Sequence, residues 1–255
     1  MKVTIIQTHL FWEDKTANLE HFAALLSALA EATDLIVLPE MFSTGFSMQP
    51  ESLAEPMDGP TVQWMRSKAA ETKAAMVGSL MVKEGDCYYN RLVWMFPDGT
   101  FQHYDKRHLF SYGTENEHYT AGTKQLLVNW KGWKICPLIC YDLRFPVWSR
   151  NTMGYDLLLY VANWPERRKH AWNTLLAARA IENQSYTVGV NRIGADGNGV
   201  PHPGDSQVVD FMGHPLFVQK DTEAVVTVEL DKAPQDAFRA QFGFLQDQDK
   251  FLLEG

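Results

Sequence analysis

Two kinds of hydrophobic pattern alternate along the chain. Short, nearly continuous apolar runs are typical of buried strands, and they cover residues 3–7, 35–38, 75–82, 134–139, 157–161 and 186–191. Longer segments predict helices over residues 17–32, 61–72 and 172–183. The first of these carries Leu19, Phe22, Leu26 and Leu29 at helical spacing, and the second follows Pro60. The alternation of strands and helices indicates an α/β protein.

Hairpins interrupt that alternation. Residues 89–95 and 100–104 have strand character and flank a Phe-Pro-Asp-Gly sequence at 96–99, which is typical of a hairpin turn. Two further strands are predicted at 207–210 and 224–229. Because hairpins join antiparallel strands and helical crossovers join parallel ones, we expect mixed sheets whose outer faces are covered by helices.

The composition is that of an ordinary globular protein. The chain has 255 residues, of which 45% are hydrophobic and 21% charged. Neither a repeat nor a linker-like segment divides it, so we expect one domain over residues 1–255. The tail from about residue 236 is rich in phenylalanine. It is expected either to dock on a partner subunit or to pack on its own domain.

The net charge of −8 disfavours nucleic acid and anionic membranes as partners. Only three cysteines are present, Cys87, Cys136 and Cys140, which is too few for a disulfide framework. The first residues enter a predicted strand directly, so no signal peptide is expected, and no apolar run approaches the roughly 20 residues of a membrane span. These features favour a cytoplasmic protein.

Cys140 is the first candidate for chemistry. It ends the apolar run 135–140 and is followed at once by the polar and proline-containing sequence Tyr-Asp-Leu-Arg-Phe-Pro at 141–146. A cysteine at the end of a buried strand is rigid yet accessible, as a nucleophile must be. Cys136, inside the same run, has the character of a small core residue.

Two other predicted strands end on charged side chains. Glu40 follows the run 35–38 and could accept the thiol proton, although it could equally be a surface or capping glutamate. Lys106 follows strand 100–104 and could stabilise an oxyanion, although alone it would fit a solvated lysine better. The backbone N–H of Tyr141, next to Cys140, could bind the same oxyanion.

Other catalytic motifs are missing from the sequence. It contains no His-Glu-x-x-His, no Cys-x-x-Cys, no phosphate-binding loop and no G-x-G-x-x-G after a strand. We therefore expect a hydrolase that needs no metal and no cofactor.

Taken in order, the segments resemble those of the nitrilase superfamily of carbon-nitrogen hydrolases. The matching stretches are 38–40 (Leu-Pro-Glu), 104–110 (Tyr-Asp-Lys-Arg-His-Leu-Phe), 140–146, 163–165 (Asn-Trp-Pro), 177–184, 191–194 and 204–206. The resemblance implies a four-layer αββα sandwich with two mixed sheets, usually a homodimer. It also implies a catalytic triad of Glu40, Lys106 and Cys140. A second glutamate should precede the Ala121–Gly122 pair. Glu115 stands at the matching position, and Glu117 is the alternative.

Stretches 104–110 and 140–150 resemble bacterial omega-amidases. That likeness implies hydrolysis of the terminal amide of a short 2-oxo dicarboxylic acid monoamide, such as 2-oxoglutaramate. The alternatives are a nitrilase, an N-carbamoyl amidohydrolase or a non-catalytic binding protein on the same fold. The predicted substrate-binding residues are Tyr141, Phe42, Arg144, Phe145 and Trp164.

An arginine is expected to bind the remote carboxylate of such a substrate. Arg144 is one candidate, and Arg167 and Arg168 are others. A structural salt bridge of Arg144 with Asp142, or with a glutamate of the site, is the competing interpretation.

Overall fold

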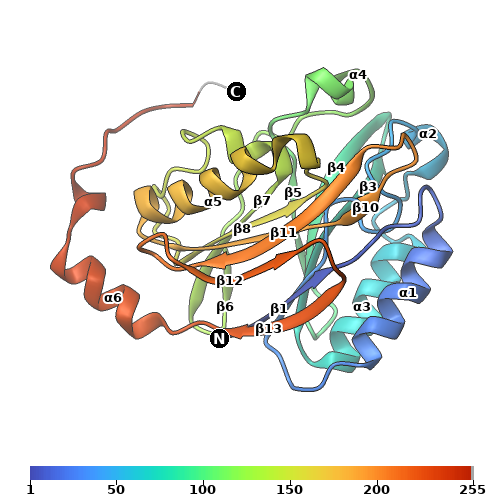
Figure 1. Ribbon diagram of the computed structural model, residues 1–255. Helices are drawn as coiled ribbons and strands as arrows, with labels where there is room; N and C mark the ends of the chain where they lie inside the picture. The colour runs from blue at the N-terminus through green and yellow to red at the C-terminus, as the bar shows by residue number, and fades with distance from the viewer. Residues whose placement is uncertain (254–255) are drawn as a thin grey trace.

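The computed structural model describes residues 1–253, in which two mixed β-sheets pack face to face between helices (Figure 1). The first sheet has the strand order β13-β1-β2-β3-β4-β5. Its strands are β1 (Lys2–Gln7), β2 (Leu35–Val37), β3 (Ala75–Glu84), β4 (Cys87–Met95), β5 (Phe101–Asp105) and β13 (Ala224–Glu229). Strands β1, β2 and β3 run parallel, and the other pairs are antiparallel.

The second sheet has the order β10-β11-β9-β8-β7-β6, with β12 paired to β11. Its strands are β6 (Val128–Trp130), β7 (Trp133–Ile139), β8 (Leu157–Ala162), β9 (Tyr186–Asn191), β10 (Ile193–Ala195), β11 (Pro201–Val209) and β12 (Pro215–Lys220). Strands β7, β8 and β9 are parallel, and antiparallel strands lie on both sides of them.

Helices cover the outer faces and complete four layers. Helices α1 (Lys15–Ser27) and α3 (Pro60–Thr72) lie on the first sheet, and α5 (Lys169–Asn183) lies on the second (Figure 1). Val77 and Trp94 of the first sheet share one core with Leu138 and Leu159 of the second. A separate core joins the first sheet to α1 and α3. The predicted αββα sandwich with mixed sheets is therefore confirmed.

The element boundaries differ from the expected ones in several places. Helix α1 ends at Ser27 rather than near residue 32, because the chain must turn so that Asp34 can pair with Lys2 at the start of β1. Strand β11 begins at Pro201, six residues before the predicted start at 207. Strands β6, β10 and β12 were not predicted, since their apolar runs are short or interrupted by polar residues.

The C-terminal segment begins with a helix. Helix α6 (Lys232–Gln241) is held on its own chain by Gln235 and Arg239, which both donate hydrogen bonds to the Gln184 carbonyl oxygen. Beyond α6 the chain runs along one edge of the molecule (Figure 1). The remaining helices are α2 (Pro50–Leu53) and α4 (Glu115–His118). Among residues 1–253, no helix is long and apolar enough to span a bilayer.

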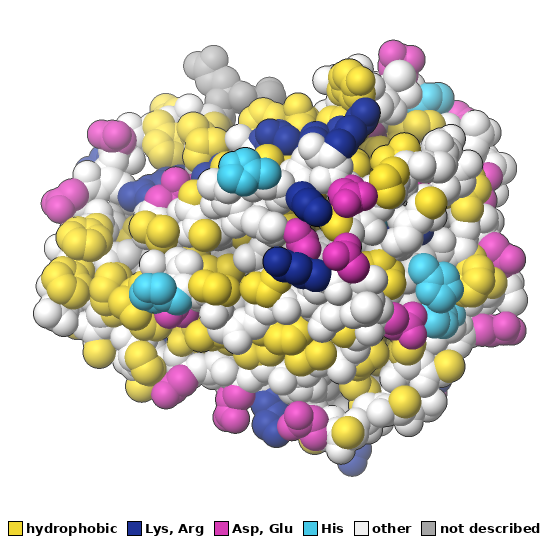
Figure 2. Space-filling view, in the orientation of Figure 1, with side chains coloured by type: hydrophobic (Ala, Val, Ile, Leu, Met, Phe, Trp, Pro, Cys, Tyr) yellow, Lys and Arg dark blue, Asp and Glu magenta, His cyan; other side chains and the backbone are white. Residues whose placement is uncertain are grey.

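The face drawn in Figure 2 mixes basic and acidic side chains. A continuous basic stripe would be typical of a nucleic-acid-binding surface.

Candidate active site

The three predicted catalytic residues come together where strands of both sheets end. Glu40 follows β2 and Lys106 follows β5, so both come from the first sheet. Cys140 directly follows β7 of the second sheet. All three line a cavity of about 420 Å³. The carboxyl ends of parallel strands are where open α/β sheets usually bind ligands, and here two such edges face each other.

Lys106 lies between two carboxylates. Its Nζ donates to Glu40 Oε1 at 2.8 Å and to Glu115 Oε2 at 2.9 Å. Lys106 is 1% exposed, and both glutamates are fully buried. Glu117, by contrast, is exposed. The structure therefore places Glu115, the first residue of α4, in the position expected for the second glutamate.

Two asparagines that the sequence analysis did not select fix these carboxylates. Asn90 Nδ2 donates to Glu40 Oε1 at 2.9 Å and to Glu115 Oε1 at 3.0 Å. The backbone N–H of Asn163 donates to Glu40 Oε2 at 2.8 Å. Asn90 was detectable in principle as a buried polar residue within strand β4, and Asn163 belongs to a stretch that carried the family resemblance. Each oxygen of Glu40 thus has a hydrogen-bond donor.

The backbone at Cys140 is left-handed. Its φ angle is 41°, a region that non-glycine residues avoid at a cost of about 1–3 kcal/mol. The residue stands at the sharp turn between β7 and the short 3₁₀ segment Cys140–Arg144. A nucleophile on such a turn projects into the cavity while the strand behind it stays rigid, as in the nucleophile elbow of other hydrolases.

The thiol of Cys140 is protonated at rest. Burial is the largest influence and Glu40 is the second, and together they raise the pKa of the thiol well above its usual range. The positive charge of Lys106 and the backbone N–H of Asn163 act in the opposite direction but do not outweigh them. A hydrogen bond between the thiol and Glu40 also raises the pKa. A thiolate at Cys140 would therefore have to form by transfer of the proton to a base in contact with it.

The charge of Lys106 is held firmly in place. Burial by itself would lower the pKa of Lys106, but Glu115, Glu40 and Cys140 raise it well above that of a free lysine. Burial and the nearby charge of Glu40 raise the pKa of Glu115, while Lys106 opposes the shift. Lys106 consequently remains an ammonium.

A buried carboxylate connects the nucleophile turn to the lysine loop. Asp142 accepts hydrogen bonds from the Tyr104 hydroxyl at 2.8 Å and from the backbone N–H groups of His108 and Ile139, each at 3.0 Å. His108 Nδ1 also lies 2.8 Å from Asp142. Because Tyr104 and His108 flank Lys106 in sequence, Asp142 sets the distance between the two strand ends. The competing interpretation of a salt bridge from Asp142 to Arg144 is wrong, since the described residues contain no such pair.

Gly122 allows the segment after α4 to lie close to the backbone at Asp105 and Lys106. Its N–H donates to the Lys106 carbonyl oxygen at 2.9 Å. A Cβ at this position would lie 2.1 Å from the carbonyl oxygen of Asp105, which is a severe clash with backbone. Only glycine lets the segment after α4 lie against the end of β5.

The mouth of the cavity carries three arginines, each next to an aromatic ring. Arg144 lies 5.0 Å from the ring of Trp164, Arg167 lies 5.7 Å from that of Tyr112, and Arg168 lies 4.9 Å from that of Phe110. All six residues line the cavity, as does Tyr141. The predicted substrate-binding residues Tyr141, Arg144 and Trp164 thus line the cavity.

Two predicted substrate-binding residues lie elsewhere. Phe42 is fully buried between the first sheet and the helices, where it contacts Phe22 and Trp64. Phe145 stacks on His108 at 3.7 Å between ring centroids, behind Tyr141. Neither residue lines the cavity, so Phe42 and Phe145 are not its walls. Sequence proximity to Glu40 and Cys140 did not reveal which way these side chains turn.

Several cavity residues had no sequence signal because they come from separate loops and, for His202, from the start of strand β11. These are Trp12, Glu13, Phe46, Ser47, Met48, Gln49, Asp196, Asn198, Val200 and His202. Of these, His202 is buried, and burial lowers its pKa to about 4, so it is neutral at pH 7.

Comparisons with known proteins agree with this architecture. A family model described as carbon-nitrogen hydrolase matches residues 2–239. Omega-amidase YafV of Yersinia enterocolitica is 46% identical over 99% of this chain and 98% of its own length. The 2-oxoglutaramate amidase of Bacillus subtilis (strain 168) is 31% identical over 91% of this chain and 92% of its own length.

A solved structure is similar along the whole chain. The CN-hydrolase superfamily protein XC1258 of Xanthomonas campestris, crystallised with an arsenic adduct in its active site, has a TM-score of 0.96 and 45% identity. The match covers 100% of this chain and 99% of that one. From the matched family model, the full-length relatives and the shared fold, it follows that the chain belongs to the carbon-nitrogen hydrolase family.

Proposed function

We propose that this protein is an omega-amidase. It hydrolyses the terminal amide of short 2-oxo dicarboxylic acid monoamides, such as 2-oxoglutaramate and 2-oxosuccinamate, to the 2-oxo acid and ammonia. The observation that carries the proposal is the buried Lys106 between Glu40 and Glu115, next to Cys140, beneath a mouth with three arginines. Similarity to an omega-amidase and a 2-oxoglutaramate amidase supports the choice of substrate.

In the first half-reaction, Glu40 accepts the proton of Cys140 as the sulfur attacks the amide carbon. This coupling is required because the thiol has a raised pKa and is not ionised beforehand. The ammonium of Lys106 and the N–H of Tyr141 stabilise the oxyanion. Glu40 then transfers its proton to the amide nitrogen, and ammonia leaves.

In the second half-reaction, the thioester on Cys140 is hydrolysed. Glu40 removes a proton from water as the water oxygen attacks the thioester carbon. The sulfur of Cys140 then leaves and takes this proton back from Glu40. Glu115 takes no proton in this scheme. Together with Asn90 it holds Lys106 and Glu40 in fixed positions through both half-reactions.

The arginines at the mouth select the acid. A buried carboxylate without a partner is costly, so the remote carboxylate of the substrate needs a cationic donor. Arg168 fits this role well. It is partly buried and lines the cavity, and a negative charge on Cys140 acts to raise its pKa against the lowering effect of burial, so the two groups lie within electrostatic reach of each other. Arg144 and Arg167 line the same cavity and are the other candidates for this role.

A substrate panel tests the proposal. Ammonia release is measured with 2-oxoglutaramate, 2-oxosuccinamate, a neutral amide of equal length, a nitrile and an N-carbamoyl amino acid. The two 2-oxo acid amides should have the highest kcat/KM. Equal kcat/KM for 2-oxoglutaramate and the neutral amide would overturn the omega-amidase assignment. A preference for the nitrile or the carbamoyl compound would reassign the enzyme within its family.

We also propose that residues 1–255 act as one domain that forms a homodimer in the cytoplasm. The segment after residue 236 exposes Phe242, Phe244 and Leu252, a set of apolar side chains suited to a second copy. The three cysteines are unpaired, which suits a reducing compartment. Light scattering should give the mass of a dimer for the full chain. A version ending at residue 241 should dissociate to monomers at a higher protein concentration than the full chain does. A monomer in both would contradict this proposal.

A further inference from the structure

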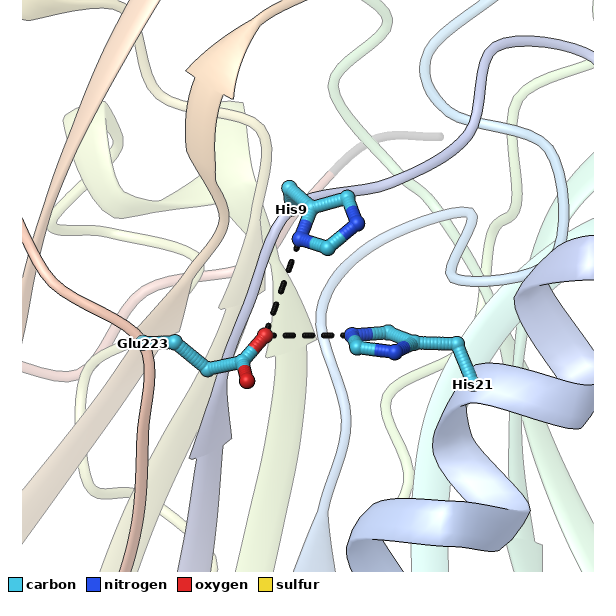
Figure 3. Close-up of side chains that lie close together, drawn as sticks. All are labelled: His9, His21 and Glu223. Carbon is cyan, nitrogen blue, oxygen red and sulfur yellow. Dashed lines mark hydrogen bonds and ion pairs between the residues drawn. The ribbon is translucent and has the colours of Figure 1, made fainter.

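Two histidines and a glutamate converge on the surface away from the reaction centre (Figure 3). His9 follows β1, His21 lies on α1, and Glu223 lies in the turn between β12 and β13. Glu223 Oε2 is 3.1 Å from His21 Nε2 and 3.6 Å from His9 Nδ1. The rings of the two histidines are 4.6 Å apart between centroids. One oxygen and two ring nitrogens therefore point into the same small space.

We propose that His9, His21 and Glu223 form a binding site for a divalent transition-metal ion, with Zn²⁺ as its best occupant. Two imidazoles and one carboxylate are a ligand set that zinc uses with water in the fourth position. Imidazole nitrogen disfavours Mg²⁺ and Ca²⁺, which prefer oxygen ligands. The residues are far apart in sequence, so no metal-site spacing could reveal them.

The distances fit a tetrahedral ion. With zinc–ligand bonds of about 2.0–2.1 Å, neighbouring ligands of a tetrahedron lie about 3.3 Å apart. The two measured distances to Glu223 are close to this value. The three ligand atoms all lie within 4.8 Å of one another, so the remaining His9–His21 edge needs to shorten by at most about 1.5 Å. Rotation of the half-exposed His9 side chain can supply that movement.

The surroundings permit entry and hold two ligands ready. The side chains of His9 and Glu223 are 45% and 40% exposed, so water and ions reach them. The hydroxyl of buried Thr8 contacts both His21 Nε2 and Glu223 Oε2, which places these two atoms side by side, and an ion bound to Nε2 would replace the Thr8 contact on that nitrogen. Arg192 is the positive charge that opposes a cation here.

The site would join three segments and lies next to a wall of the cavity. Trp12 and Glu13, which line the cavity, follow His9 closely. His9 pairs with Ile193, and the ring of Trp12 would be only 2.4 Å from a Cβ placed on Gly197. An ion bound at His9 therefore ties the Trp12 segment to α1 and to the β12–β13 turn.

Zinc binding is best measured on the Cys140→Ala protein, because a reactive thiol would bind zinc itself. After treatment with a chelator, equilibrium dialysis against Zn²⁺ should give one ion per chain. At zinc about 100-fold above Kd, Tm should rise by roughly 5–10 °C, while Mg²⁺ should leave it unchanged.

Variants locate the ion. His21→Gln and Glu223→Gln should each weaken zinc binding by more than the roughly 10–100-fold expected for loss of an outer-shell partner. Glu223 lies in a surface turn, so its replacement keeps the fold and tests the site even if His21→Gln does not fold. His214→Gln is the matched control, since His214 is 70% exposed and paired with Asp210. The proposal is overturned if the Glu223 variant keeps full zinc binding, if the control loses it equally, or if Mg²⁺ gives the same Tm shift.

Discussion

Charged side chains lie both at the floor of the cavity and at its mouth, but their surroundings differ. At the floor, Glu40, Lys106 and Glu115 are buried and every one is hydrogen-bonded to another or to an asparagine. At the mouth, Arg167 is exposed and Arg168 only partly buried, and their guanidinium groups lie against aromatic rings. The floor is fixed by the fold, whereas the mouth can adapt to a ligand.

The difference separates chemistry from selection. A buried charge that loses its partner costs several kcal/mol, so the floor tolerates few changes. A partly exposed arginine loses much less when it is replaced, because water takes over part of its interaction. Changes at the floor should therefore lower kcat for every substrate, and changes at the mouth should alter the ranking of substrates.

The largest effect is expected at the nucleophile. Cys140→Ala should reduce kcat on the order of 10⁶-fold, as removal of the nucleophile does in other hydrolases. Cys136→Ala is the control, because Cys136 is fully buried in the same strand and does not line the cavity. Its kcat should stay within a few-fold of the parent. More than trace amidase activity in Cys140→Ala would contradict the covalent mechanism.

Glu40→Gln should lower kcat by about 10²–10⁴-fold for all amides, since the same carboxylate serves both half-reactions. A second measurement distinguishes a Glu40 that acts as the base from a Glu40 that only shifts the pKa of the Cys140 thiol. The charge of Glu40 raises the pKa of Cys140, so its removal should let iodoacetamide alkylate Cys140 at lower pH. Faster alkylation with lost turnover is the expected pair of results. Unchanged turnover would move the base elsewhere, with Glu115 the first residue to examine.

Gly122→Ala should lower kcat about 10²-fold, because a Cβ there displaces the end of β5 and with it Lys106. Misplacing a catalytic group by about 1 Å typically costs that much. Gly132→Ala is the control, since a Cβ at Gly132 meets no atom within 4 Å. Gly132 has a φ of 79°, which an alanine adopts only with strain, so the Tm of each variant should be measured together with kcat. A Gly122→Ala enzyme with normal kcat would show that Lys106 tolerates movement.

The smallest effect is expected at the mouth. Arg168→Leu should lower kcat/KM for 2-oxoglutaramate by about tenfold, in line with a lost hydrogen bond to a charged group, and do so mainly through KM. The neutral amide of equal length should be scarcely affected. Arg167→Leu, at a more exposed position, should change both substrates less. Equal losses on the acid and the neutral amide would make Arg168 a structural residue rather than the carboxylate anchor.

The strand-end positions of Glu40, Lys106 and Cys140 could be read from the sequence, but the choice of Glu40 and Lys106 as partners of Cys140 rested on the family resemblance. Glu40, Lys106 and Cys140 each follow a short apolar or hairpin-bound segment, and regular strands bring such positions to common edges. Glu115 needed the family resemblance, since the four-residue helix that buries it has no pattern of its own. Asn90 lies in the interior of a strand, where a polar side chain indicates a buried partner but does not name it.

The mouth could not be predicted in the same way. Phe42 and Phe145 were chosen for their closeness in sequence to Glu40 and Cys140, but packing turned both away from the cavity. Trp12 and Asn198 reach the cavity from loops almost two hundred residues apart. Loop geometry depends on long-range contacts that neither hydrophobic period nor turn composition encodes.

Glu40 and Lys106 follow strands of one sheet and Cys140 follows a strand of the other, so the distances between these residues depend on how the two sheets are aligned. Asp142 helps to fix this alignment, because it accepts hydrogen bonds from Tyr104 of β5, from His108 of the loop after β5 and from Ile139 of β7. Mild heating or a low concentration of denaturant that lets one sheet shift against the other would separate Glu40 from Cys140 while every strand stays intact. We therefore expect the enzyme to lose activity before it unfolds. On heating, activity should be lost at a lower temperature than the far-ultraviolet circular dichroism signal.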